Sequence, residues 1–188
     1  MTCKPSLPRR RLLHRASHLA TLAAASLALP LASGSARAAV GGERRLSLVH
    51  THTGERLALA FAVGAEPVAG ALGALDRFLR DHYNGTVGRI DPRLFDQLHR
   101  LQAVLGHDGP YEIISGYRSP ATNERLRERG GGVARHSLHL EGRAIDVRLP
   151  GVALADLRDA ALSLRAGGVG TYLQQRFVHL DTGRPRSW

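Results

Sequence analysis

Two short apolar runs in the C-terminal part of the chain each contain a polar residue of the metal-binding type. Asp146 stands within the run 144–147, His179 stands within the run 177–180, and His139 precedes Asp146 on the same segment. Short apolar runs are typical of core strands, where an unpaired carboxylate is costly to bury. Two imidazoles and one carboxylate are the protein ligands of many catalytic zinc sites, with a fourth position left to water. The pattern therefore predicts a metal site at the edge of core strands.

Each of these residues also has a plainer interpretation. A single histidine in an apolar strand is more often a hydrogen-bonded core residue than a ligand, and an aspartate after an apolar run often serves as a turn or cap residue. The three residues together favour a metal. Another pair, His50 and His52, has no carboxylate or cysteine to complete a ligand set, so we expect these two residues to serve the fold or lie on the surface.

The sequence argues against two other hydrolytic chemistries. The single cysteine, Cys3, lies in a leading segment that we expect to be removed, which leaves no thiolate nucleophile and no disulfide framework. No serine stands in a Gly-x-Ser-x-Gly motif. Metal-dependent chemistry is what remains.

The segment around the predicted ligands resembles a known family. Residues 115–120 read Ser-Gly-Tyr-Arg-Ser-Pro, and a later segment has the pattern Ser-x-His-x-x-Gly-x-x-x-Asp, formed by Ser137, His139, Gly142 and Asp146. In this order, and followed by His179, these elements resemble those of the zinc D-Ala-D-Ala metallopeptidases, which include the LAS-type peptidoglycan peptidases. Residues from about 43 to 188 look most like the murein endopeptidases of that group.

The resemblance implies Zn2+ as the cofactor, held by His139, Asp146 and His179. It also implies hydrolysis of amide bonds in the cross-linking peptides of peptidoglycan. Arg118 matches the family's substrate-binding arginine, whose planar fork of donors suits a carboxylate. Ser137 matches a serine that contacts substrate or orients the loop.

The residue that would transfer protons is left open by the sequence. Many members of the resembled family carry a glutamate three residues before the last ligand, but here that position is Arg176, which cannot accept a proton. Asp181 shares a strand face with His179, so it could act as the base or could orient the imidazole of His179. His136 is a second candidate for proton transfer, and Glu141 is a weaker one.

Residues 1–38 are predicted to be an export signal that precedes a domain at 39–188. Three arginines at 9–11 precede an uncharged stretch at 19–32, and Ala-Arg-Ala at 36–38 fits the small-x-small rule for cleavage. The arginines resemble a twin-arginine signal. Cleavage would leave a periplasmic domain without a membrane span. The alternative is an uncleaved anchor, for which the apolar stretch is short of the ~20 residues that a spanning helix needs.

Nucleic acid is not an expected partner. Removal of residues 1–38 takes away six basic residues and no acidic one, so the formal net charge falls from +10 to +4. The remainder has no lysine and arginine tract interleaved with aromatic residues.

Periodicity predicts one α+β domain, with a small antiparallel β-sheet and helices packed on one side. Alternating apolar residues at 45–63 predict a β-hairpin that turns at Thr53-Gly54. Asp91-Pro92 predicts the start of a helix whose buried stripe ends with Val104 and Leu105. Further helices are expected at 69–82, 119–129 and 154–165, and further strands at 111–115, 142–149, 169–172 and 177–181.

We therefore predict an exported zinc-dependent murein endopeptidase, expected to be a monomer. The arginine at 176 keeps open a second possibility, a non-catalytic peptidoglycan-binding module with a vestigial zinc site. A D,D-carboxypeptidase or dipeptidase of the same fold is a third. The sequence leaves undecided whether 4-3 or 3-3 cross-links are cut.

Overall fold

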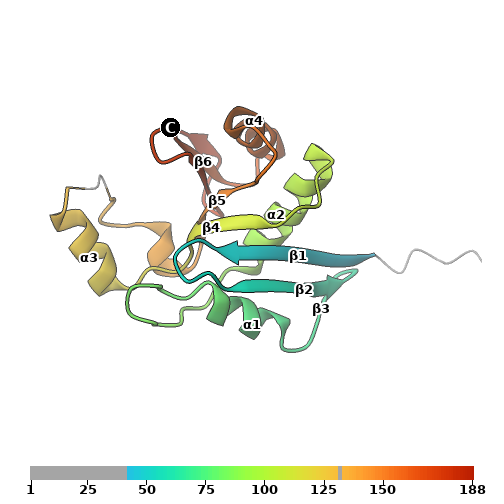
Figure 1. Cartoon of the computed structure of the whole chain (residues 1–188), viewed down its shortest axis with the longest axis horizontal. Coiled ribbons are helices and arrows are strands. Elements are labelled where there is room, and N and C mark those ends of the chain that lie inside the picture. The colour runs from blue at the N-terminus through green and yellow to red at the C-terminus, as the bar shows by residue number, and fades with distance from the viewer. Residues whose placement is uncertain (1–41, 131–132) are drawn as a thin grey trace, which may run out of the picture. The chain divides into compact units, whose positions relative to one another are not determined.

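An eight-stranded sheet is the central element of residues 42–130 and 133–188, which this computed structural model describes (Figure 1). Its strands lie in the order β3-β2-β1-β4-β5-β7-β6-β8. Their bounds are β1 Glu43–His50, β2 Arg56–Val63, β3 Glu66–Pro67, β4 Tyr111–Ser115, β5 Ala144–Arg148, β6 Gly168–Tyr172, β7 Phe177–Asp181 and β8 Arg186–Ser187.

Most neighbouring strands are antiparallel, as the sequence predicts. The hairpin β1–β2 and the pairs β4–β5, β5–β7 and β6–β7 all run in opposite directions. Two pairs differ from the expectation, because β1–β4 and β6–β8 are parallel. Both parallel pairs join strands that are distant in sequence, a kind of pairing on which local patterns carry no information.

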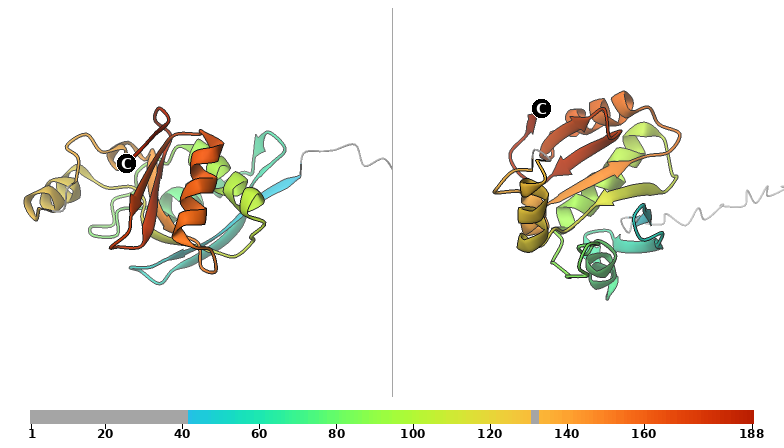
Figure 2. Two further views of the ribbon diagram at one scale, coloured as in Figure 1. Left: turned by 90° about the horizontal axis from the view of Figure 1, so that it is seen from above. Right: turned by 60° about the vertical axis from the view of Figure 1, so that its left-hand side comes forward.

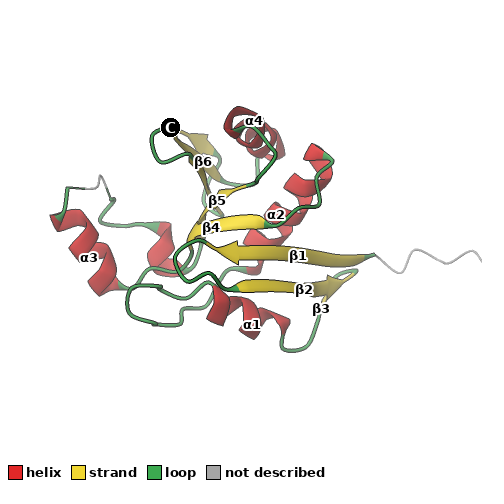
Figure 3. Ribbon diagram, in the orientation of Figure 1, coloured by secondary structure: helices red, strands yellow, loops and turns green. Residues whose placement is uncertain are grey.

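Four α-helices and a short 3-10 helix complete the described fold (Figure 3). α2 and α4 lie side by side; α2 packs against β1, and α4 packs against β6 and β7 (Figures 1 and 2). α1 packs against β2, whereas α3 stands apart from the sheet and adds no residue to the core (Figure 1). The bounds are α1 Ala71–Phe78, α2 Pro92–Leu105, α3 Pro120–Glu128, η1 Leu138–Glu141 and α4 Leu154–Leu164.

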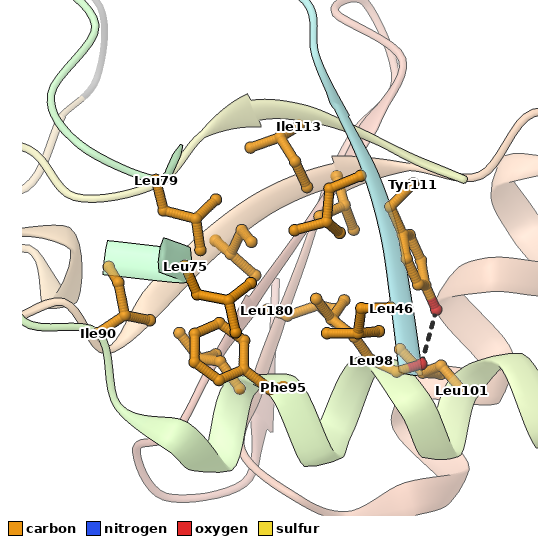
Figure 4. Packing of buried hydrophobic residues seen from close by; sticks show 14 of the residues in the cluster. Leu46, Leu75, Leu79, Ile90, Phe95, Leu98, Leu101, Tyr111, Ile113 and Leu180 are labelled. Atoms are coloured by element: carbon orange, nitrogen blue, oxygen red, sulfur yellow. Dashed lines mark hydrogen bonds between the residues drawn. The ribbon is translucent and has the colours of Figure 1, made fainter. Parts of the chain in front are cut away.

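One hydrophobic cluster joins the sheet to α1, α2 and α4 (Figure 4). The phenol of Tyr111 in β4 is fully buried there, and its hydroxyl donates a hydrogen bond of 2.9 Å to the carbonyl of Leu98 in α2. Each fully buried leucine or phenylalanine side chain stabilises the fold by about 1.5–3 kcal/mol. The described residues belong to one compact unit, which confirms the predicted single α+β domain.

The predicted start of α2 agrees with the structure, and one of its predicted core residues does not. The carboxylate of Asp91 caps the helix by accepting the backbone N–H of Arg93 at 3.0 Å, and Pro92 occupies the first turn. Val104, predicted to be buried, is 54 % exposed, because the helix turns that position away from the cluster in its last turn.

α1 is shorter than the predicted helix at 69–82. It ends at Phe78 because the carbonyl of Leu79 accepts the backbone N–H of Tyr117 at 2.8 Å. The carboxylate of Asp81 then accepts backbone N–H groups of Tyr83 and Ser119, both at 2.9 Å. These contacts hold the chain after α1 against the start of α3, and they come from residues that are distant in sequence.

The predicted export signal at 1–38 lies outside the described residues and stays a prediction. Within the described part of the chain, no helix is both long enough and apolar enough to cross a membrane.

Gly142 joins three parts of the fold. It ends η1 in the left-handed conformation, with φ at 64°. Its carbonyl accepts the backbone N–H of Asp91 at 2.9 Å, so the end of η1 is tied to the start of α2. A Cβ atom at this position would overlap the carbonyl group of Arg89.

We expect Gly142→Ala to lower the free energy of unfolding by at least about 3 kcal/mol, since left-handed strain of about 1–2 kcal/mol adds to a forced backbone shift. Gly54→Ala is a matched control, because Gly54 has φ at 73° but no atom within 4 Å of the added Cβ. Its expected loss is about 1 kcal/mol. Urea unfolding of both variants measures the difference, and equal losses would contradict the role assigned to the overlap.

Candidate metal centre

Three predicted ligands converge above β5 and β7. Nε2 of His139 lies 3.2 Å from Nδ1 of His179. Oδ1 of Asp146 lies 2.8 Å from that Nδ1 and 3.3 Å from that Nε2. Among the described residues this is the one group of three or more histidine, cysteine, aspartate or glutamate side chains whose ligand atoms all lie within 4.8 Å of one another.

Strand register brings two of the ligands together. β5 and β7 pair so that Asp146 lies opposite His179, and Val147 lies opposite Val178. Both valines are fully buried in the hydrophobic core. Because successive side chains of a strand point to opposite faces, Asp146 and His179 point together to the face opposite the core.

The 3-10 helix η1 supplies the third ligand. The Ser137 hydroxyl oxygen caps this helix by accepting the backbone N–H of His139 at 3.4 Å, so Ser137 orients the loop and also lines the space above the ligands. Gly142 closes the helix at its other end. His139 is thereby held buried above the end of β5.

The outer nitrogen of each imidazole has a fixed partner. Nδ1 of His139 lies 2.7 Å from the carbonyl oxygen of Gly116, and Nε2 of His179 lies 3.3 Å from Oδ2 of Asp181. Both partners are acceptors, so each outer nitrogen donates a hydrogen and the inner nitrogen faces the other ligands. Such partners fix the tautomer and the ring orientation of metal-binding histidines. The cluster therefore has the donor set and the ring orientations that a divalent transition metal requires.

Asp181 lies behind His179 and is completely buried. Its carboxylate accepts backbone N–H groups of Gly168 and Gly183 at 2.9 and 2.8 Å and pairs with the guanidinium of Arg186 at 2.7 Å. Burial alone would raise the pKa of Asp181. The hydrogen bonds from His179, Arg186 and the two backbone groups have the larger combined effect and hold this pKa well below its usual range. Asp181 touches the nitrogen of His179 that faces away from the other ligands, a position that suits an orienting carboxylate.

Burial and hydrogen bonding set the charges of the three ligands. Burial lowers the pKa of His139, which keeps its ring neutral. Burial also disfavours charge on His179, but hydrogen bonds with Asp146 and Asp181 outweigh it and raise the pKa of His179 to about 9. Burial raises the pKa of Asp146, yet attraction to His139 and hydrogen bonds with both imidazoles leave it well below the ordinary value.

Arg118 lies beside the cluster and is largely buried. Its Nη2 is 3.8 Å from Oδ2 of Asp146, the oxygen that does not face the imidazoles, and 3.4 Å from the hydroxyl of Ser115. Its backbone N–H donates to the carbonyl of His139 at 3.1 Å. Tyr117, its neighbour, packs against the hydrophobic core.

A groove of about 510 Å³ opens above the ligands. Arg118, Ser137 and His136 line it, but Arg176 and Glu141 do not. Glu141 pairs at the surface with Arg143 at 3.0 Å. Arg176 has a left-handed backbone, with φ at 57°, and lines a different depression beside Glu112 and Arg148. The aromatic residues that flank the groove are His52, His82 and Tyr83 on the β1 side and Tyr172, Phe177 and Trp188 on the β6 side.

Several of these groove residues have no local signal in the sequence. His82 stacks on His52, with ring centroids 4.2 Å apart, and Trp188 lies near His179. His50 is buried beneath the hairpin turn, where its Nδ1 accepts the backbone N–H of His52 at 3.2 Å. Long-range contacts place His82 and Trp188 beside these partners, so spacing in the sequence does not reveal their positions.

The raised pKa of His179 predicts that metal binding releases a proton. At pH 7 a group with pKa about 9 is protonated in the metal-free site, and the incoming metal must displace that proton from Nδ1. We expect about one proton released per Zn2+ at pH 7, and an apparent affinity that rises about tenfold per pH unit up to about pH 9. Titration calorimetry in buffers of different ionisation enthalpy measures the released proton. Heats that do not depend on the buffer would contradict this charge assignment.

The chain is similar over most of its length to known proteins of one family. The family described as peptidoglycan L,D-endopeptidase MepK matches residues 38–188. The chain is 48 % identical over 145 residues to the peptidoglycan L,D-endopeptidase MepK of Escherichia coli K12, an alignment that covers 77 % of this chain and 80 % of that protein. It is 40 % identical over 146 residues to the probable peptidoglycan L,D-endopeptidase MepK of Haemophilus influenzae, which covers 77 % of this chain and 78 % of that protein. No solved structure was found that matches the chain. The resemblance to the LAS-type murein peptidases is thus confirmed, and the chain belongs to the peptidoglycan L,D-endopeptidase MepK family.

Proposed function

We propose that the chain is a zinc-dependent murein endopeptidase that hydrolyses amide bonds in the cross-linking peptides of peptidoglycan. The observation that carries this proposal is the buried cluster of His139, Asp146 and His179, open to a groove, in a chain of the MepK family. The names of the relatives specify an L,D bond. We extend that stereochemistry to the bond cut here.

Two imidazoles and one carboxylate leave an open position on zinc, and the bound ion would supply a water of lowered pKa and polarise the scissile carbonyl. The residues of the chain prepare that site. Gly116 and Asp181 fix the tautomers of the two imidazoles. Asp146 has a pKa well below its usual range and so stays ionised as a ligand.

Arg118 is proposed to bind a carboxylate of the peptide. Its guanidinium lines the groove next to Asp146, and only one of its nitrogens is engaged, by Ser115 and Asp146. A fork of donors in a largely buried position orients a carboxylate through two parallel hydrogen bonds. Arg118 would thereby hold the peptide at a fixed distance from the metal ligands.

His136 is our candidate for proton transfer, and we assign Asp181 the orienting role. Among the described residues that line the groove, Asp146 is the only carboxylate, and it belongs to the ligand set. Asp181 is enclosed behind His179. His136 lines the groove, and an imidazole can both accept a proton from water and deliver one to a leaving amine.

The described residues of the groove include no carboxylate outside the ligand set, which also favours a second candidate function. A peptidoglycan-binding module would keep the groove and the cluster but would not cut its ligand. We propose periplasmic action after export by the twin-arginine route in either case, with the protein as a monomer.

The deciding experiment is digestion of purified cross-linked muropeptides by the zinc-loaded protein. We expect dimers joined through an L,D bond to become monomers, excess chelator to stop the reaction, and Zn2+ to restore it, because the metal supplies the nucleophile. Binding of dimers without cleavage would support the module instead. Release of terminal D-alanine with dimers left intact would support a carboxypeptidase.

Two substitutions separate proton transfer from ligand orientation. His136→Ala is expected to keep its zinc and lose about 10²-fold or more in turnover. Asp181→Asn is expected to weaken zinc binding by about 10- to 100-fold and to recover most activity in excess zinc. Arg176→Ala is the control, because Arg176 lies outside the groove. Zinc content and turnover measured on the same samples decide the assignment, and an Asp181→Asn protein that keeps its zinc but not its rate would make Asp181 the base.

A further inference from the structure

The exposed indole ring of Trp188 lines the groove beside the metal ligands. Its ring centroid lies 5.3 Å from that of His179, and the two rings are tilted by 52°. It lines the same groove as the ligands, yet 52 % of its surface remains exposed. His179 does not depend on this ring for its orientation, since Asp146 and Asp181 already bind both of its nitrogens. The position of Trp188 therefore calls for another explanation.

The backbone holds Trp188 in this place. β8 pairs with β6 in parallel; the N–H of Trp188 donates to the carbonyl of Val169 at 3.3 Å, and its carbonyl accepts the N–H of Thr171 at 3.0 Å. The indole N–H donates to the hydroxyl of Tyr172 at 3.3 Å. A Cβ atom on Gly170 would lie 2.6 Å from the indole, so the ring occupies space that only glycine leaves free. A side chain fixed at so many points is pre-organised for contact.

Arg186 supports the ring and links it to the metal site. Its guanidinium lies 4.8 Å from the ring centroid of Trp188 and pairs at 2.7 Å with Asp181, which in turn binds His179. The cation over the indole is worth about 0.5–1 kcal/mol at an exposed site. Arg186 thus contacts both the indole of Trp188 and the carboxylate of Asp181, which orients His179.

A row of paired residues crosses the sheet beneath the groove. Ser115 pairs with Asp146, Asp146 with His179, and His179 with Gly170. Arg118 touches the first residue of this row, and the indole of Trp188 lies over the last. Strands lie about 4.8 Å apart, so the row spans about 14 Å, which is the length of about four extended residues. The metal ligands occupy its middle.

We propose that Trp188 is a substrate-binding residue that packs against the aliphatic part of the cross-linking peptide, on the side of the scissile bond opposite Arg118. The proposal rests on the endopeptidase function proposed above. The groove has a cationic end at Arg118 and an aromatic end at Trp188, where Tyr172 and Phe177 stack with ring centroids 4.5 Å apart. The charge of Arg186 at that end is paired with Asp181. A peptide with a carboxylate at one end and an alkyl chain at the other fits this polarity, because aromatic side chains bind by burying apolar area.

Turnover of a cross-linked peptide dimer by zinc-loaded variants tests the contact. Trp188→Ala is expected to raise KM about tenfold or more with a smaller change in kcat, because it removes binding to substrate. Trp188→Phe should keep most of the affinity. Leu173→Ala is the matched control, since Leu173 is 72 % exposed on the adjoining turn and does not line the groove. Wild-type KM in Trp188→Ala, or a defect that excess zinc fully repairs, would overturn the proposal.

A second measurement needs no variant, because Trp188 is the only tryptophan in the chain. Mixing zinc-loaded protein with the sugar-free peptide dimer should change tryptophan emission within the first turnover and reduce quenching by acrylamide. Tryptophan emission that does not change when the peptide dimer is added, or that changes only with muropeptides carrying sugars, would overturn the assignment to the peptide. A protein that cleaves the dimer without this response refutes the role of Trp188 alone. A protein that shows the response but cuts nothing refutes the endopeptidase function alone.

Discussion

The pairing of Asp146 with His179 across β5 and β7 is the constraint on which the site depends. A shift of either strand by one residue would turn a valine toward the groove and a ligand toward the core. The apolar neighbours of both residues prevent this shift, because they are fully buried in the hydrophobic cluster. Removal of one member of a buried charged pair costs about 3–5 kcal/mol. Core packing and the geometry of the site therefore both require the same register between β5 and β7.

The two faces of the sheet have different roles. One face packs against α1, α2 and α4. The other carries the ligands and the groove. Polar contacts behind the ligands support the second face. Gly116, distant in sequence, binds His139, whereas Asp181 and Arg186 lie behind His179 and are close to it in sequence. The metal site thus extends well beyond the three ligands, into the strand that ends at Ser187.

Local chemistry made much of this structure predictable. The hairpin at 45–63, the capped start of α2 and the strands that carry Asp146 and His179 follow from alternation, capping and turn residues. The ligand set follows from residue types in apolar runs, and the structure brings those residues together. Trp188 could not be predicted as a groove residue, because the parallel pairing of β8 with β6 places it there. The early end of α1 likewise depends on a hydrogen bond from Tyr117, far along the chain.

The conformation of Arg176 has a consequence for how this site could change over evolutionary time. Its left-handed backbone directs the side chain toward Glu112 and Arg148, and the carbonyl of Arg176 accepts the Nε–H of Arg148 at 2.7 Å. A glutamate introduced at this position would inherit that direction and meet another carboxylate rather than the metal ligands. A Glu-x-x-His arrangement with the glutamate facing the metal ligands would therefore require a rebuilt hairpin, and a single codon change would not achieve it.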